Sequence, residues 1–202
     1  MRRSLYWAVA MTMIAAGAAQ AQETGTPIFK APYRAFTTYE LGGSFSDPGE
    51  GVSFALEGFY SYGSGPHDFG VRAGFADFEG DVTAIAIGGN FRTRVINHTE
   101  EFPFDGALTV GFGGLLGEDI DDTFLVPVGL SVGRRILLEG SRTSFVPYLH
   151  PVLVPTLGGE DDDVQFGLGL GVDIRFEPNW SVRVSGGIGD IEGVGVSFVY
   201  VR

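Results

Sequence analysis

The chain has 202 residues, with 13 Lys and Arg against 25 Asp and Glu, and its formal net charge at pH 7 is −12. This acidity argues against nucleic acid as a partner, because binding to phosphates needs basic patches. The chain contains no cysteine, which excludes a disulfide framework, and it is long enough to bury one domain without such crosslinks.

The first residues have the three parts of a secretory signal peptide. Arg2 and Arg3 precede a largely apolar stretch, which ends at the small residues Ala19 and Ala21. This order predicts a cleaved signal peptide over residues 1–21.

The next segment, residues 22–35, contains Pro27 and Pro32 and follows no strand pattern, so we expect an N-terminal tail before the first strand. After residue 21, no apolar run is long enough for a helix that spans a membrane. If the mature chain crosses a bilayer, it must therefore do so as a closed barrel.

Apolar and small residues alternate with period two from residue 36 to residue 202, which predicts an all-β domain. Turn signals divide this part of the chain into about ten strands, and eight is the alternative if two short segments form one bent strand. Most of these strands reach or exceed the length that crosses a bilayer at a barrel tilt. The expected strands are residues 36–46, 51–62, 68–77, 81–95, 103–116, 123–137, 143–157, 163–176, 180–189 and 193–202.

The two faces of these strands differ in a way that orients them. One face carries large apolar side chains, and the other carries mainly Gly, Ser, Ala and Thr with isolated charges. The second face would make a poor solvent surface, whereas inside a barrel it would form a lumen with the apolar face toward lipid. We therefore expect six representative side chains to point outward: Phe166, Leu168, Leu170, Val182, Val184 and Phe198.

One strand is unusual because Pro147, Pro151 and Pro155 occupy positions of the same parity. Proline has no backbone N–H, so all three missing donors would face the same neighbour. This pattern predicts local bulging or incomplete pairing of the strand over residues 143–157.

The signal peptide, the Gly-rich alternating strands such as residues 167–172, and a last strand that ends the chain together resemble the small bacterial outer-membrane β-barrel family. The resemblance covers residues 36–202 and implies a closed antiparallel up-and-down transmembrane barrel in the bacterial outer membrane. It also implies that both termini lie in the periplasm, so that residues 22–35 would be an N-terminal periplasmic tail. The expected partners are outer-membrane lipid, lipopolysaccharide and the barrel-insertion machinery, and we expect a monomer.

Fifteen carboxylates lie in five turns without Lys or Arg, at every second chain reversal. The topology of an up-and-down barrel would bring these turns to one rim, where crowded carboxylates repel each other. A solvated, flexible rim is the simpler interpretation. The more specific interpretation is a weak Ca²⁺ or Mg²⁺ site, because these cations prefer clustered oxygen ligands. Its residues would be Asp119, Asp121, Asp122, Asp161, Asp162 and Asp163.

Four charged residues fall on the small-residue face, namely Glu40, Glu57, Arg72 and Arg183. Charges that point into a lumen must be paired or hydrated. We expect them to form one charged layer, either as a structural network that fills the lumen or as the constriction of a narrow pore.

The three histidines, His67, His98 and His150, have neither metal-ligand spacing nor a recognisable nucleophile motif nearby. We therefore expect no enzymatic activity and no cofactor apart from the weak divalent cation. The predicted function is a structural, surface-interaction or narrow-pore barrel of the outer membrane. The alternative is a soluble periplasmic barrel that binds a small apolar ligand, and its apolar face would point inward.

Overall fold

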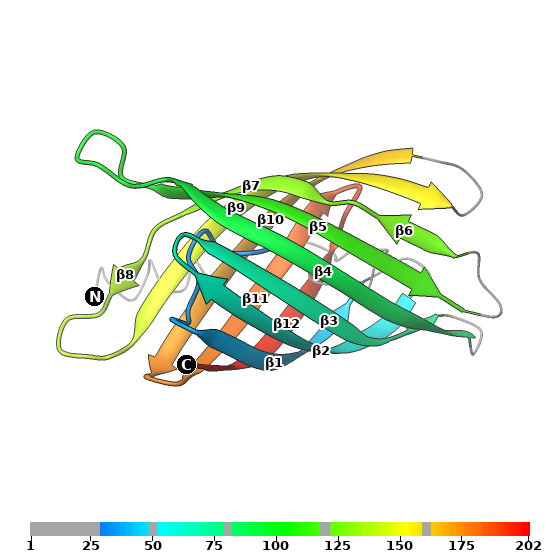
Figure 1. The fold of residues 1–202 in the computed structure, drawn as a ribbon, viewed down its shortest axis with the longest axis horizontal. Coiled ribbons are helices and arrows are strands. Elements are labelled where there is room, and N and C mark those ends of the chain that lie inside the picture. Colours follow the sequence, from blue (N-terminus) through cyan, green and yellow to red (C-terminus); the bar gives the residue numbers. More distant parts are fainter. Residues whose placement is uncertain (1–28, 49–51, 79–81, 118–121, 159–162) are drawn as a thin grey trace, which may run out of the picture.

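The computed structural model describes residues 29–48, 52–78, 82–117, 122–158 and 163–202, which form a single closed β-sheet (Figure 1). All strand pairs are antiparallel, and the last strand, β12, pairs with the first, β1. The strands are β1 (Tyr39–Asp47), β2 (Val52–Ser64), β3 (His67–Phe78), β4 (Val82–Ile96), β5 (Asp105–Leu116), β6 (Thr123–Leu125), β7 (Val128–Gly133), β8 (Ile136–Leu137), β9 (Ser144–Gly158), β10 (Asp163–Glu177), β11 (Trp180–Gly189) and β12 (Gly193–Val201).

The described residues contain no helix of the length and hydrophobicity needed to cross a membrane.

The barrel wall has ten strand positions, which confirms the predicted count. β6 and β7 occupy a single position, since both pair with β5 on one side and with β9 on the other. The short strand β8 extends the pairing with β9 near the chain termini. The eight-strand alternative is wrong, because each of the other predicted segments has a place of its own in the sheet.

The three prolines of β9 explain why its neighbour is interrupted. β9 pairs with β10 without a register shift from Ser144 to Thr156. The carbonyls of Pro147 and Pro155 instead accept bonds from the other side, from the N–H groups of Arg134 and Val126. In an antiparallel strand, a residue's N–H and C=O point the same way, so the missing proline donors face β6 and β7. The partner strand is incomplete on this side, as the proline parity predicts.

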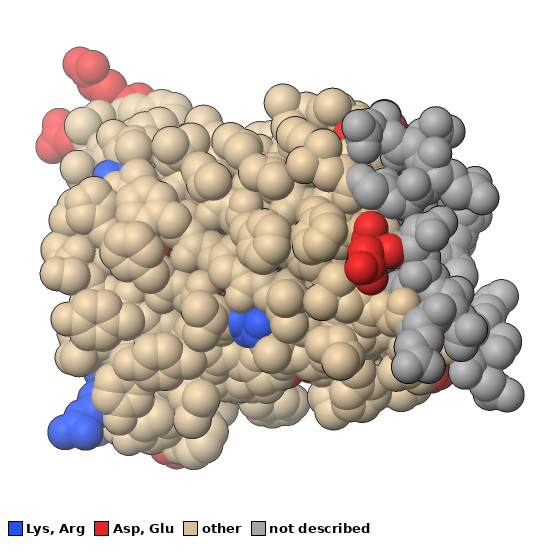
Figure 2. Space-filling view, turned by 45° about the vertical axis from the view of Figure 1, so that its right-hand side comes forward, with Lys and Arg blue, Asp and Glu red and all other residues tan. Residues whose placement is uncertain are grey.

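Large apolar side chains cover the outer surface of the barrel, and every strand contributes at least one that is exposed. Phe166, Leu170 and Phe198 are 50, 40 and 64% exposed, and the other three side chains predicted to point outward are half-buried on the same face. Figure 2 shows an uncharged surface across most of the wall, with acidic side chains toward both ends and a basic patch within it. The prediction that the apolar face points outward is confirmed.

The two ends of the barrel differ in their connections. The strand ends that flank all five acidic turns lie at one end. The pairs that link one turn to the next are Asp47 with Val194, Val52 with Phe78, Ile85 with Leu116 and Thr123 with Gly158. The other end, here called the terminal end, holds the start of β1, the end of β12 and the four remaining reversals. Thr38 and Tyr39 there donate backbone hydrogen bonds to the carbonyl of Arg202.

Residues 29–36, here called the inner segment, lie within the barrel. Phe29, Ala31 and Phe36 are at most 5% exposed. Phe29 and Ala31 pack with the inward side chains Val146, Tyr148, Val152 and Val154 of β9, and Phe36 packs with Val199 and Val201 of β12. The described part of the expected periplasmic tail, from residue 29 onward, therefore fills part of the lumen, a position that the sequence analysis did not foresee.

Candidate functional site

The lumen contains an arginine held between two carboxylates. Arg183 of β11 donates to both oxygens of Glu40, over 3.0 Å to Oε1 and 2.5 Å to Oε2, and its Nε lies 3.2 Å from Oδ2 of Asp173. Glu40 is on β1, so the arginine reaches across β12, where its register partner is the small residue Ser197. A bidentate pair of this kind fixes the geometry of both groups. The arrangement connects the neighbouring strands β10 and β11 with β1, which lies on the other side of β12.

The other two residues of the predicted charged layer, Glu57 and Arg72, lie in the same lumen. Glu57 of β2 is 3% exposed, and both its carboxylate oxygens lack a hydrogen-bond partner among the described residues. Arg72 of β3 lies over Gly88 of β4, where a Cβ atom would be only 2.9 Å from its Nε. The small residues of the inner face therefore leave the room that the charged side chains occupy.

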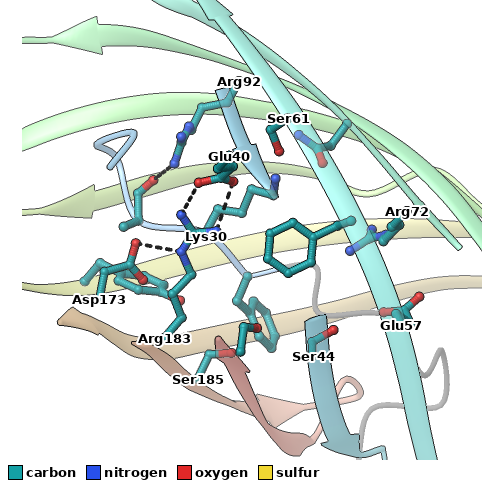
Figure 3. Close-up of a pocket in the computed structure, with 16 residues that line it drawn as sticks. Lys30, Glu40, Ser44, Glu57, Ser61, Arg72, Arg92, Asp173, Arg183 and Ser185 are labelled. Carbon is teal, nitrogen blue, oxygen red and sulfur yellow. Dashed lines mark hydrogen bonds and ion pairs between the residues drawn. The ribbon is translucent and has the colours of Figure 1, made fainter. Parts of the chain in front are cut away.

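All four predicted lumen residues line one cavity of about 50 Å³ (Figure 3). A space of this size holds a few water molecules, which would hydrate the carboxylate of Glu57. The inner segment contributes Phe29, Lys30 and Ala31 to the cavity wall. The charged layer thus faces the inner segment on one side, and it is not the edge of an open lumen.

Phe29 is the first described residue of the inner segment, and it is buried. Its ring lies edge-on to His150 of β9, with centroids 6.0 Å apart. It occupies space above Gly169 of β10, where a Cβ atom would come within 2.1 Å of the phenyl ring. His150 accepts a hydrogen bond from the backbone N–H of Lys30 at 3.1 Å and contacts Thr109 Oγ1 at 2.7 Å.

Arg92 of β4 holds the middle of the inner segment. Its Nη1 donates to the carbonyls of Ala31 and Tyr33, and its Nε donates to Asp68 Oδ2 at 2.8 Å. Both partners of the ion pair are almost fully buried, with side chains 6 and 3% exposed. One arginine therefore satisfies two carbonyls of a segment without secondary structure and one buried carboxylate of the wall.

Further contacts hold the inner segment toward the terminal end. The hydroxyl of Tyr33 donates to Asp105 Oδ2, which also lies 2.7 Å from Nδ1 of His98. Burial, reinforced by this bond to Asp105, raises the pKa of Tyr33, so its hydroxyl stays protonated and able to donate at neutral pH. Nη1 of Arg175 donates to the carbonyl of Ala35 at 2.9 Å. Six wall strands, β3, β4, β5, β7, β9 and β10, supply hydrogen-bond partners of the inner segment.

The proposed divalent-cation site falls mainly outside the described residues. Asp119, Asp121, Asp161 and Asp162 are not described. Asp122 immediately precedes β6, and Asp163 is the first residue of β10. No group of three or more potential ligands that could hold a metal ion occurs within the described ranges. The cation site stays a prediction.

The sequence analysis did not include Asp68, Arg92, Asp105 or Asp173 among the charged residues of the lumen. Asp173 lies on the small-residue face beside Gly169 and Gly171, so its parity could have found it. Asp68 and Asp105 lie at strand starts that resemble turns in sequence. The partners of Arg92 lie on an irregular segment, which has no periodicity from which to infer a position.

Comparisons with known proteins agree with the barrel fold. No family model matches the chain, and no curated relative matches its sequence. The beta domain of the Bordetella autotransporter Brka matches with a TM-score of 0.55 and 14% identity, over 81% of this chain and 99% of that one. This likeness shows a shared fold.

Two further solved structures match with lower TM-scores. A bacterial polysaccharide outer-membrane secretin matches with a TM-score of 0.48 and 12% identity, over 75% of this chain and 57% of that one. The chain thus covers little more than half of the secretin's length. The Acinetobacter baumannii outer membrane protein Omp33 matches with a TM-score of 0.35 and 9% identity, over 82% and 98% of the two chains.

Proposed function

We propose that this chain is an outer-membrane β-barrel whose own inner segment closes the lumen, and that it has a structural or surface-interaction role without catalysis. The observation that carries this proposal is the direction of the two faces. Large apolar side chains point outward on every strand, and the charged side chains Glu40, Glu57, Arg72 and Arg183 line the interior. A soluble barrel with an apolar ligand site would have the opposite arrangement.

The location follows from the same reasoning. An outer wall of this composition is suited to lipid and to the acyl chains of lipopolysaccharide, and the fold shared with an autotransporter beta domain supports insertion by the barrel-insertion machinery. The terminal end would face the periplasm, and the end with the acidic turns would face outward. A closed barrel leaves no free sheet edge, which supports a monomer.

Replacing Leu170 with arginine tests the lipid-facing wall. Leu170 is at the middle of β10, and a charge at the bilayer midplane costs about 2–4 kcal/mol. We expect Leu170→Arg to lower the free energy of unfolding in vesicles by about this amount, measured by urea titration with the gel-mobility shift between folded and unfolded barrel. Val164→Arg, at the end of the same strand, is the matched control and should cost about 0–1 kcal/mol. Equal small effects of both changes would contradict the membrane assignment.

A narrow pore is the second candidate function, supported by the charged cavity beside Phe29. Planar-bilayer recordings distinguish the two roles. A barrel whose lumen is closed by the inner segment should show no steady conductance. Gly169→Leu should displace Phe29 from its place on β10 and produce frequent openings, because the leucine side chain would occupy the position of the phenyl ring. Gly58→Leu is the control, since a Cβ atom at Gly58 meets no atom within 4 Å. Steady conductance of the unaltered protein would favour the pore.

A further inference from the structure

A second cavity, of about 230 Å³, lies at the terminal end between the inner segment and the barrel wall. The inner segment contributes residues 32–34 and Phe36, and Thr37 follows it. The wall contributes the β2–β3 turn, β3, β4 and the link between β7 and β8. Its walls include buried residues, such as Arg92 and Asp68, and exposed ones, such as Arg94 and Arg135. The cavity therefore runs from the interior to the solvent at the terminal end. We call it the mouth cavity.

The mouth cavity has a large excess of positive charge. Four arginines line it, namely Arg34, Arg92, Arg94 and Arg135, and Asp68 is the carboxylate among its lining residues. Asp68 is already paired with Arg92 at 2.8 Å. None of the ion pairs found in the described residues involves Arg34, Arg94 or Arg135. Three uncompensated guanidinium groups therefore share one cavity.

Two of these guanidinium groups are held in place before any ligand arrives. Arg34 donates to the carbonyl of His67 at 2.9 Å, and its Cζ lies 5.8 Å from the centre of the Phe36 ring. Arg135 lies over the ring of Tyr33, with its Cζ 4.8 Å from the ring centre. Stacking on an aromatic ring fixes the plane of a guanidinium and leaves its edge N–H groups available for hydrogen bonds. Arg94 is exposed and completes the set from β4.

We propose that the mouth cavity binds a phosphate group. Three guanidinium groups that converge on one space offer more charge and more donors than a carboxylate can use, whereas a phosphate presents a charge near −2 and at least three acceptor oxygens. Arginine forks match phosphate geometry in bidentate fashion. The volume suits a single phosphate or pyrophosphate group, carried by a small soluble molecule or by a lipid headgroup. This site depends on neither conductance nor membrane location, so it can fail or hold independently of the proposed function.

The test is protection of arginines from phenylglyoxal, mapped by peptide mass spectrometry on the folded protein in an uncharged detergent. Millimolar inorganic phosphate or pyrophosphate should slow modification of Arg94 and Arg135 several-fold relative to chloride at equal ionic strength. Arg142, which is exposed at the same end but does not line the cavity, is the internal control and should be modified at the same rate in both salts. Equal rates at Arg94 and Arg135 in the two salts, or equal protection of Arg142, would overturn the proposal.

A titration with variants makes the same test quantitative. Arg94→Gln combined with Arg135→Gln should raise the dissociation constant for pyrophosphate at least about tenfold, because it removes two positive charges and the charge-assisted hydrogen bonds that they donate. Arg142→Gln should leave the dissociation constant unchanged. The phenylglyoxal experiment is then repeated with vesicles of phosphatidylcholine, with and without phosphatidic acid, to identify which kind of molecule carries the bound phosphate group. Protection by phosphatidic acid indicates a headgroup ligand, and protection by soluble phosphate alone indicates a soluble one. An unchanged affinity in the double variant would refute the site.

Discussion

Arg183→Met is expected to destabilise the barrel by about 3–5 kcal/mol, because it leaves two buried carboxylates without their cation. Glu40 is 2% exposed and Asp173 is 6% exposed, and Arg183 contacts both. Methionine fills a similar volume, so the loss would reflect charge more than packing. Urea titration of the protein in vesicles, followed by the gel-mobility shift, measures the change in the free energy of unfolding.

A second substitution separates the ion pair from the packing. Adding Glu40→Met to Arg183→Met removes one of the uncompensated charges, so the double variant should be more stable than Arg183→Met alone. Arg183→Lys keeps the charge but cannot form the bidentate pair with Glu40, and it should have an intermediate stability. If the double variant were less stable than Arg183→Met, the side chains at these positions would contribute mainly by packing.

The wall of this barrel could be predicted from the sequence because large apolar and small side chains alternate along its strands. Alternation along β10, from Val164 to Phe176, determines which side chains face outward, and a one-residue slip would reverse them all. The same parity placed Glu40 and Arg183 on the inner face, where the structure pairs them. Even the interruption between β6 and β7 has a local cause, in the prolines of β9.

The inner segment could not be predicted in this way. Residues 29–36 have no repeating pattern, and their backbone groups bond with residues that are far away in sequence, such as Ser131 and His150. Proline at position 32 and the absence of alternation are equally typical of a solvated tail. A docked segment differs from a solvated tail in having hydrogen-bond donors on the wall to bind its carbonyls. Those donors come together only once the barrel has closed.

The space for the inner segment has a signal in the sequence, although an ambiguous one. Gly169 and Gly187 lie beneath Phe29, and a Cβ atom at either position would approach its ring within 3 Å. Read along a strand, such glycines indicate only a small-residue lumen face. They indicate a docked segment only when considered together with an aromatic residue just upstream of the barrel.

Arg92→Met is expected to have two separable effects, because Arg92 pairs with Asp68 and also binds the carbonyls of Ala31 and Tyr33. Loss of the pair leaves Asp68 as an uncompensated buried charge, at a cost of about 3–5 kcal/mol. Loss of the carbonyl bonds should release the inner segment from the wall. Release would expose the peptide bond after Lys30, so trypsin should cleave there in the variant and spare the unaltered protein, as mass spectrometry would show.

Adding Asp68→Asn to Arg92→Met tests whether the two effects are independent. The neutral amide should recover much of the lost unfolding free energy, since no charge then remains unpaired at this position. It cannot replace the donors to Ala31 and Tyr33, so cleavage after Lys30 should stay fast. Recovery of both stability and protection by Asp68→Asn would show that the segment is held mainly by its packed side chains, led by Phe29 and Phe36. Recovery of stability alone would identify Arg92 as the residue that keeps the lumen closed.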